Sequence, residues 1–259
     1  NNYDDGFDLD SSNNNSLVNN TVNSDIYGLH TYGFQLSSSL SNVVTGNRVT
    51  ASAANRIGLY FKNSNYSVFS SNTISTSGSG ASYAVYFNSS AGNVFGNGSL
   101  SASYAGVPDV YVEGTGINNF TNCSFNKSDT AFAAGSTGAV NVFWYADVHV
   151  VNMTGDDIAS ASVNISNVNG TSIANLTTNA TGWNTTTIQE YVQNVTGIYK
   201  FTPHWFNASK TGYAANRTAT AVSENHLGSN AVTRALSLPL TDCTMLSIPN
   251  MAYVLENSV

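Results

Sequence analysis

The first half of the chain repeats itself at a nearly constant interval. Five blocks of seventeen residues align without a gap, and they begin at Gly6, Gly33, Gly58, Ala84 and Asp109. Successive starts are separated by 27, 25, 26 and 25 residues. Such a period indicates a solenoid, in which each repeat forms one coil that stacks on its neighbours.

Four columns of this alignment are apolar. The second and fourth positions are two residues apart, so their side chains share the buried face of a strand. The columns are Phe7, Phe34, Leu59, Val85 and Val110; Leu9, Leu36, Phe61, Phe87 and Val112; Leu17, Val44, Phe69, Phe95 and Phe120; and Val22, Val49, Ile74, Leu100 and Phe125. Each coil is therefore predicted to contain short strands separated by turns, as in a right-handed parallel β-helix of about five coils.

Two further columns are rich in asparagine and are expected at the turns. Asn and Gly adopt left-handed backbone angles easily, and stacked Asn amides can hydrogen-bond along the pile. The predicted ladder residues are Asn15, Asn42, Asn93 and Asn118, with Ser67 in the same column, and Asn20, Asn47 and Asn72, with Gly98 and Cys123 continuing the second column.

About seventeen N-x-S/T triplets are present, and in the solenoid they begin beside the ladder columns rather than in them. The pattern predicts inward ladder residues next to outward residues that can carry sugars. The glycosylation candidates are Asn14, Asn19, Asn65, Asn88, Asn97, Asn119, Asn122, Asn126, Asn152, Asn164, Asn175, Asn184, Asn194, Asn207 and Asn216.

The repeat stops after about residue 136, and a different pattern follows. Alternating valine and aromatic residues fill 140–152, and further strands are expected at 161–168, 171–178, 184–188, 198–209, 217–222 and 231–238. About seven strands in this length predict an antiparallel, Ig-like or transthyretin-like β-sandwich. The predicted organisation is a β-helix over 1–136, a sandwich over 137–240 and a tail over 241–259.

Both halves resemble known families. The second half is similar to carboxypeptidase-regulatory-like, or transthyretin-like, domains in its A-x-V-x-I of Ala161 to Ile165, its T-x-A-T-G-W of Thr178 to Trp183 and its K-x-G-Y of Lys210 to Tyr213. The solenoid resembles NosD-type β-helix repeats of archaeal surface proteins, and such pairs of modules occur in exported methanogen proteins. Neither resemblance brings a catalytic motif that maps onto this chain. Some NosD-type proteins deliver copper, but the sequence has no Cys/Met/His cluster for that chemistry.

Composition restricts the partners. Charged residues make up 9% of the chain and the net charge is -7, so no basic surface is available for nucleic acid. No apolar run approaches the roughly 20 residues of a membrane span. The chain begins at Asn1 without a Met or a signal peptide, which indicates a processed or trimmed product. Together with the sugar acceptors, the low charge predicts an extracellular, cell-surface or envelope protein.

Few residues are candidates for chemistry. Asp8 and Asp10 should point outward together, where they are a weak Ca²⁺ site, an acid–base pair or merely a solvated first coil. A polysaccharide lyase or hydrolase would need clustered carboxylates, or a carboxylate with Lys or Arg, in one groove. Only Asp8, Asp10, Lys62 and Glu113 are expected near the same outward face.

Other candidates concern contacts and cross-links. Tyr60, Tyr86 and Tyr111 share an outward column that is expected to stack, to contact another subunit or to bind sugar rings. Cys123 and Cys243 could form one disulfide, within the chain or between chains. The tail could fold back on its own molecule or dock on a neighbour.

These observations predict a structural subunit of an archaeal cell envelope, such as a sheath or surface layer. Copies would associate through the ends of the β-helix, the tail or both. No enzymatic activity and no cofactor are expected. The alternatives are a carbohydrate-active β-helix enzyme and a carbohydrate-binding or adhesion module.

Overall fold

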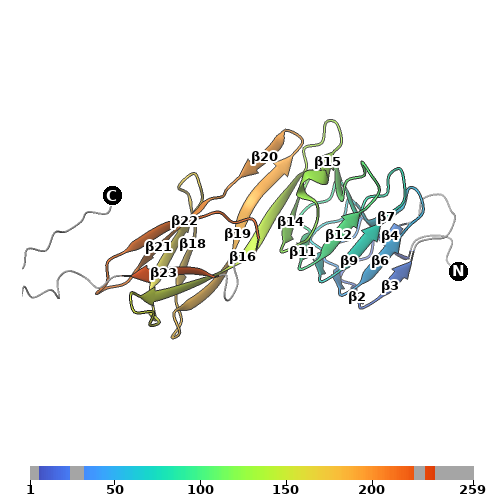
Figure 1. The fold of residues 1–259 in the computed structure, drawn as a ribbon. Helices are drawn as coiled ribbons and strands as arrows, with labels where there is room; N and C mark the ends of the chain where they lie inside the picture. Colours follow the sequence, from blue (N-terminus) through green and yellow to red (C-terminus); the bar gives the residue numbers. More distant parts are fainter. Residues whose placement is uncertain (1–5, 24–31, 225–230, 237–259) are drawn as a thin grey trace, which may run out of the picture.

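A computed structural model describes residues 6–23, 32–224 and 231–236, and the predicted tail lies outside this described part. Nearly all regular structure in it is β (Figure 1). The one helical element among these residues is a short 3₁₀ turn, η1 (Lys127–Asp129). The all-β prediction is confirmed.

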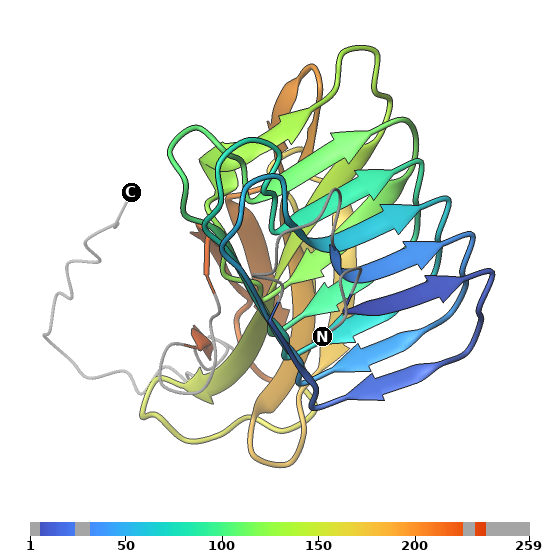
Figure 2. The ribbon, with the colours of Figure 1, turned by 90° about the vertical axis from the view of Figure 1, so that its right-hand side faces the viewer.

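The repeat folds into a parallel β-helix with three sheets. Figure 2 shows the strands of successive coils side by side. Sheet A contains β1 (Phe7–Asp10), β4 (Tyr32–Ser37), β7 (Ile57–Lys62), β10 (Val85–Asn88), β13 (Val110–Glu113) and β15 (Thr130–Phe132). The solenoid part of sheet B contains β2 (Ser16–Val18), β5 (Val43–Thr45), β8 (Val68–Ser70), β11 (Val94–Gly96) and β14 (Ile117–Thr121). Sheet C contains β3 (Thr21–Asn23), β6 (Arg48–Ala51), β9 (Thr73–Thr76) and β12 (Ser99–Ala102).

Strand register follows the sequence alignment. Phe7 pairs with Phe34 in sheet A, and Phe95 pairs with both Phe69 and Phe120 in sheet B. The apolar columns therefore stack inside the coils. Parallel rings of Phe69, Phe95 and Phe120 lie 4.7–4.9 Å apart between centroids. This aromatic pile fills the solenoid interior.

The solenoid continues into the second half through one long strand. β16 (Ala139–Asn152) pairs in parallel with β14 and in antiparallel fashion with β19 (Trp183–Asn194). β20 (Gly197–Lys200) and β23 (Val232–Leu236) complete the nine strands of sheet B. Sheet D faces this extension and contains β17 (Ser162–Ser166), β18 (Ser172–Thr177), β21 (His204–Ser209) and β22 (Asn216–Thr220). Figure 1 shows the two halves joined along β16.

Two details of the predicted sandwich are wrong. It is not wholly antiparallel, because β23 runs parallel to β16. The single strand expected over 198–209 is two strands, β20 and β21, which belong to different sheets. The break falls at Pro203, which has no backbone N–H to donate to a ladder.

Candidate functional site

Asparagine side chains form two ladders along the solenoid. The Oδ1 atom of Asn47 accepts from both the backbone N and the Nδ2 of Asn20, at 2.8 and 3.0 Å. Asn47 in turn donates from its backbone N and its Nδ2 to Oδ1 of Asn72. Its Nδ2 also donates to the carbonyl of Leu17. In the other column Asn15 bonds to Asn42 and Asn93 to Asn118 in the same way, with Ser67 between the two pairs.

A serine ladder runs beside them and was not anticipated from the sequence. The hydroxyls of Ser39, Ser64 and Ser90 each accept a hydrogen bond, at 2.9–3.0 Å, from the backbone N–H at the equivalent position one coil earlier. The donors are Ser12, Ser39 and Ser64. The three accepting serines are fully buried. They occupy the seventh position of the aligned blocks, but serine is too abundant elsewhere in the chain for this column to predict a ladder.

The turn conformation falls on different residues from those predicted. Ladder residues such as Asn42 and Asn47 do not adopt positive φ; the residues just before the ladder positions do. Among these are Asn14, Asn19, Asn97 and Asn122, with φ between 51° and 58°. The prediction of positive φ at the ladder residues is wrong. Their side chains must point inward, so the left-handed conformation falls on the preceding residue.

None of the predicted glycosylation residues is buried. The exposed ones are Asn14, Asn19, Asn97, Asn126, Asn175 and Asn207; the half-buried ones are Asn65, Asn88, Asn119, Asn122, Asn152, Asn164, Asn184, Asn194 and Asn216. By contrast, the ladder residues Asn42, Asn47, Asn72, Asn93 and Asn118 are buried. The ladder asparagines and the triplet asparagines therefore occupy different environments.

Five tyrosines cluster on the outer face of sheet A. Tyr32 and Tyr60 stack at 4.5 Å, Tyr60 and Tyr86 lie 5.1 Å apart, and Tyr83 stacks on Tyr111 at 4.6 Å. Burial raises the pKa of Tyr60 and of Tyr83. Because these rings contact one another, much of their aromatic surface is used within the molecule. The cluster adds Tyr32 and Tyr83 to the three tyrosines predicted from the sequence.

Glu113 lies far from the predicted acidic pair, Asp8 and Asp10, on the same face. Asp8 and Asp10 are exposed on β1, and Asp8 accepts a hydrogen bond from Gln35 at 3.1 Å. Glu113 lies on β13, four strands away in sheet A, and accepts from Tyr86 and Asn88. Neighbouring strands are about 4.8 Å apart, so the separation is about 19 Å. Asp8, Asp10 and Glu113 are therefore not brought into one site.

The outer face of sheet B carries an uncharged apolar surface. Val43, Val68 and Val94 are register neighbours, and they are 43%, 42% and 37% exposed. Leu40, Tyr66 and Ile117 extend this surface at its edge with exposures of 39%, 66% and 50%. No charged residue occurs in β2, β5, β8, β11 or β14. We call these six residues the valine face.

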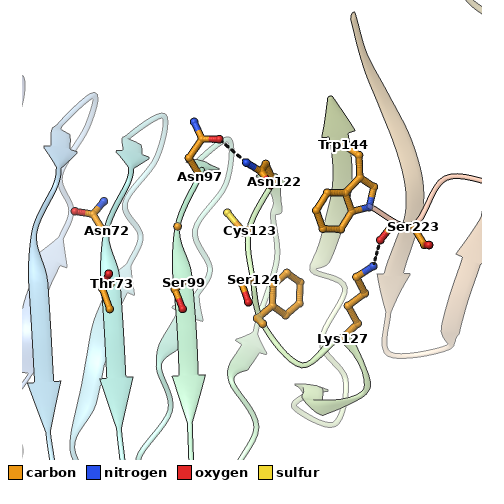
Figure 3. A pocket seen from close by; sticks show the side chains of 12 residues that line it. Asn72, Thr73, Asn97, Ser99, Asn122, Cys123, Ser124, Lys127, Trp144 and Ser223 are labelled. Atoms are coloured by element: carbon orange, nitrogen blue, oxygen red, sulfur yellow. Dashed lines mark hydrogen bonds between the residues drawn. The ribbon is translucent and has the colours of Figure 1, made fainter. Parts of the chain in front are cut away.

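A groove of about 370 Å³ lies where the solenoid meets the second half. It is lined by Asn72, Thr73, Asn97, Gly98, Ser99, Asn122, Cys123, Ser124, Phe125, Lys127, Trp144 and Ser223 (Figure 3). Lys127 forms a 2.6 Å ion pair with Glu190 and lies 4.7 Å from the centre of the Trp144 ring. Burial raises the pKa of Cys123 to about 11. Its predicted disulfide partner, Cys243, lies outside the described residues.

Comparison with known proteins identifies the solenoid. The family model described as "Periplasmic copper-binding protein (NosD)" matches residues 1–155, which is more than half of the chain. The chain belongs to the NosD family. The family's description as periplasmic agrees with a place outside the cytoplasm.

Other comparisons add little to the NosD assignment. A search of curated proteins gives no match. Among solved structures, the Bacillus anthracis TIE protein is similar at 15% identity, with a TM-score of 0.30. That similarity covers 44% of this NosD-family chain and 20% of the TIE protein, so the chain matches about a fifth of that protein's length.

The described residues of this NosD-family chain do not offer a copper site. No group of three or more His, Cys, Asp or Glu side chains lies together in the parts that the structure describes. His149 stacks on Trp183 and bonds to Asp157 at 2.8 Å, whereas His204 is fully buried elsewhere. Within the same residues, no helix has the length and apolar character needed to cross a bilayer.

Proposed function

We propose that this chain is a non-catalytic structural subunit of an extracellular archaeal cell envelope, such as a sheath or surface layer. In this proposal, copies of the chain associate with one another, and the valine face is one surface through which they do so. The observation that carries the proposal is this uncharged, exposed apolar face, which is built from consecutive coils of a rigid solenoid.

The charge distribution favours a second copy as the partner. The net charge of -7 makes copies of the chain repel one another over most of their surface. The valine face carries no charge, so repulsion is weakest where two such faces meet. Two β-sheet faces pack about 10 Å apart when their side chains interdigitate, and short β-branched side chains such as valine suit that distance.

The fold also suits a load-bearing role. Buried ladders of Asn and Ser connect each coil to the next, in addition to the backbone bonds of three sheets. Few ionisable groups take part in these contacts, so their strength depends little on pH or salt. Exposed N-x-S/T asparagines of the second half, such as Asn175 and Asn207, supply positions for a sugar coat away from the valine face.

The first test is electron microscopy of native protein from the cell-surface fraction, prepared without denaturant or reductant. Ordered tubes, hoops or sheets that contain this chain are expected. Dispersed single molecules at the concentration of the native envelope would overturn the proposed function.

The second test concerns the valine face. Val68→Lys combined with Val94→Lys places two charges in the centre of the face and should abolish assembly of the recombinant chain in light scattering and microscopy. Ser101→Lys, at an exposed position of β12 on sheet C, is the matched control and should assemble normally. Assembly by the double variant would remove the valine face from the interface.

A further inference from the structure

The second asparagine ladder ends where the junction groove begins. Its column reads Asn20, Asn47 and Asn72, and then Gly98 and Cys123. A Cβ atom at Gly98 would find the Asn72 carbonyl at 3.2 Å and the Cys123 Sγ at 3.9 Å. Gly98 does not have a positive φ, so the turn itself does not require glycine there. Because the Asn72 carbonyl lies so close, a side chain here would be crowded, and Gly98 lines the groove with backbone alone.

Three hydroxyl groups form a row along one side of this groove. Thr73 and Ser99 are register partners in sheet C, and Ser99 and Ser124 are joined by a β-bridge. All three residues are exposed. Within the described part of the chain, no hydrogen bond uses their hydroxyls, so they are available to a ligand. Figure 3 shows the three side chains aligned across successive coils.

The opposite end of the groove is aromatic and fixed in place. The Trp144 indole N–H donates to Glu190 at 2.7 Å, and Lys127 packs over the ring. Phe125 also lines the groove, and Asn122 donates to Asn97 at 2.7 Å along its rim. Fixed side chains lose little freedom when a ligand binds, which favours affinity.

This lining determines the class of ligand. Hydroxyls and amides can both donate and accept, and they suit a molecule with many hydroxyl groups of its own. The partly exposed ring of Phe125 suits its apolar C–H faces, whereas Trp144 is buried with Lys127 over its ring and forms the wall of the groove. Among the described residues of the lining, only Lys127 is charged, and its charge is paired with Glu190. We propose that the junction groove binds an uncharged oligosaccharide. This binding goes beyond the proposed structural function and does not depend on it.

The test is binding of neutral hexose and N-acetylhexosamine oligosaccharides to the full chain, first on a glycan array and then by titration calorimetry. Removing the hydroxyl row with Thr73→Val, Ser99→Ala and Ser124→Ala should weaken binding at least about tenfold, because three groups that can hydrogen-bond to the ligand are lost together. The changes are at exposed positions, so the variant should fold normally.

The matched control removes three hydroxyls of sheet C that lie outside the groove. Ser75→Ala and Ser101→Ala lie two residues further along β9 and β12 than Thr73 and Ser99, and Thr50→Val changes the register partner of Ser75 on β6. This control should bind like the unmodified chain. Binding of neutral oligosaccharides that is equal in all three proteins would overturn the assignment of the groove. Absence of binding to every neutral oligosaccharide at millimolar concentration, or a preference for acidic ones, would overturn the ligand class. These binding outcomes do not depend on whether the chain assembles, so a failure of the proposed structural function would leave this test unchanged.

Discussion

At the scale of single residues, the solenoid depends on buried Asn and Ser side chains that hydrogen-bond to the neighbouring coils. Asn47 is 1% exposed, and its amide makes contacts to the coils on both sides. A buried amide without partners would cost a few kcal/mol, so such residues are stabilising only as a complete set. The ladders therefore fix the stacking register as well as adding stability.

Removing one ladder side chain should be costly. Asn47→Ala leaves the Asn20 backbone N–H and the Leu17 carbonyl without their partners. We expect a loss of about 2–4 kcal/mol in the free energy of unfolding, measured by urea denaturation. Asn23→Ala, at an exposed position of β3, is the control and should change it by less than about 0.5 kcal/mol. Equal effects of the two changes would contradict the role of the ladder.

His204 should make stability depend on pH. It is fully buried, and neither ring nitrogen has a hydrogen bond of normal geometry within the described residues. Burial lowers its pKa below the usual value of about 6.5, although the backbone near Gln189 acts in the opposite direction. The folded state therefore disfavours the proton. Its stability contribution is complete above pH 6.5 and is lost as the pH falls below that value.

The measurement is the urea midpoint at several pH values between 7.5 and 5. The unmodified chain should lose stability over that range, and His204→Leu, which cannot be protonated, should lose less. The same pH dependence in both proteins would show that other groups cause the effect.

At the scale of elements, the gapless alignment was enough to predict how the coils pair. Column residues such as Phe34 and Leu59 are register partners in the structure because parallel strands in successive coils keep equivalent residues together. The alignment could not predict β15 or the start of β16. There the spacing shortens, since Val110 pairs with Thr130 and Phe120 with Val142, and the glycine and asparagine signals of the repeat disappear.

The turns and the groove were harder to predict than the strands. The prediction that ladder residues adopt the left-handed turn conformation is wrong, because the inward side chain and the positive φ belong to adjacent residues. The groove depends on Trp144 and Lys127, which belong to different elements beyond the repeat. Only the change from Asn72 to Gly98 in the ladder column gave a sequence signal for it.

The aromatic pile should be the strongest packing element of the solenoid. Phe95 contacts Phe69 and Phe120 as stacked rings and Phe61 and Phe87 edge-on. Phe95→Ala should lower the free energy of unfolding by about 3–5 kcal/mol.

The control for this change is Phe7→Ala in the first coil. Phe7 is only partly buried and stacks on one ring, that of Phe34. Its replacement should cost less than half as much as the change at Phe95, by urea denaturation of the full chain. Equal losses would mean that Phe95 contributes no more to stability than a partly buried ring in the first coil.

At the scale of the whole molecule, the two halves share one sheet. The sequence places a boundary near residue 136, because the repeat ends there and a new pattern begins. The alternation over 140–152 is equally compatible with a solenoid strand and with a sandwich strand, and in the structure β16 is both. A pattern of period two cannot show which neighbours a strand will pair with.

This shared strand predicts that the halves open together. Ile165→Ala removes a fully buried side chain from β17 in sheet D and should destabilise the second half. If β16 transmits that loss, hydrogen exchange in mild urea should accelerate in peptides covering 85–121 of the solenoid as well as in those covering 162–209.

Ile173→Ala on β18 is the matched control, since Ile173 is 41% exposed, and it should change exchange in neither region. Faster exchange confined to 162–209 after Ile165→Ala would show that the halves open separately despite sharing β16. In an assembled envelope, joint opening would make damage in either half release the whole subunit. Separate opening would let the solenoid keep its contacts while the second half unfolds.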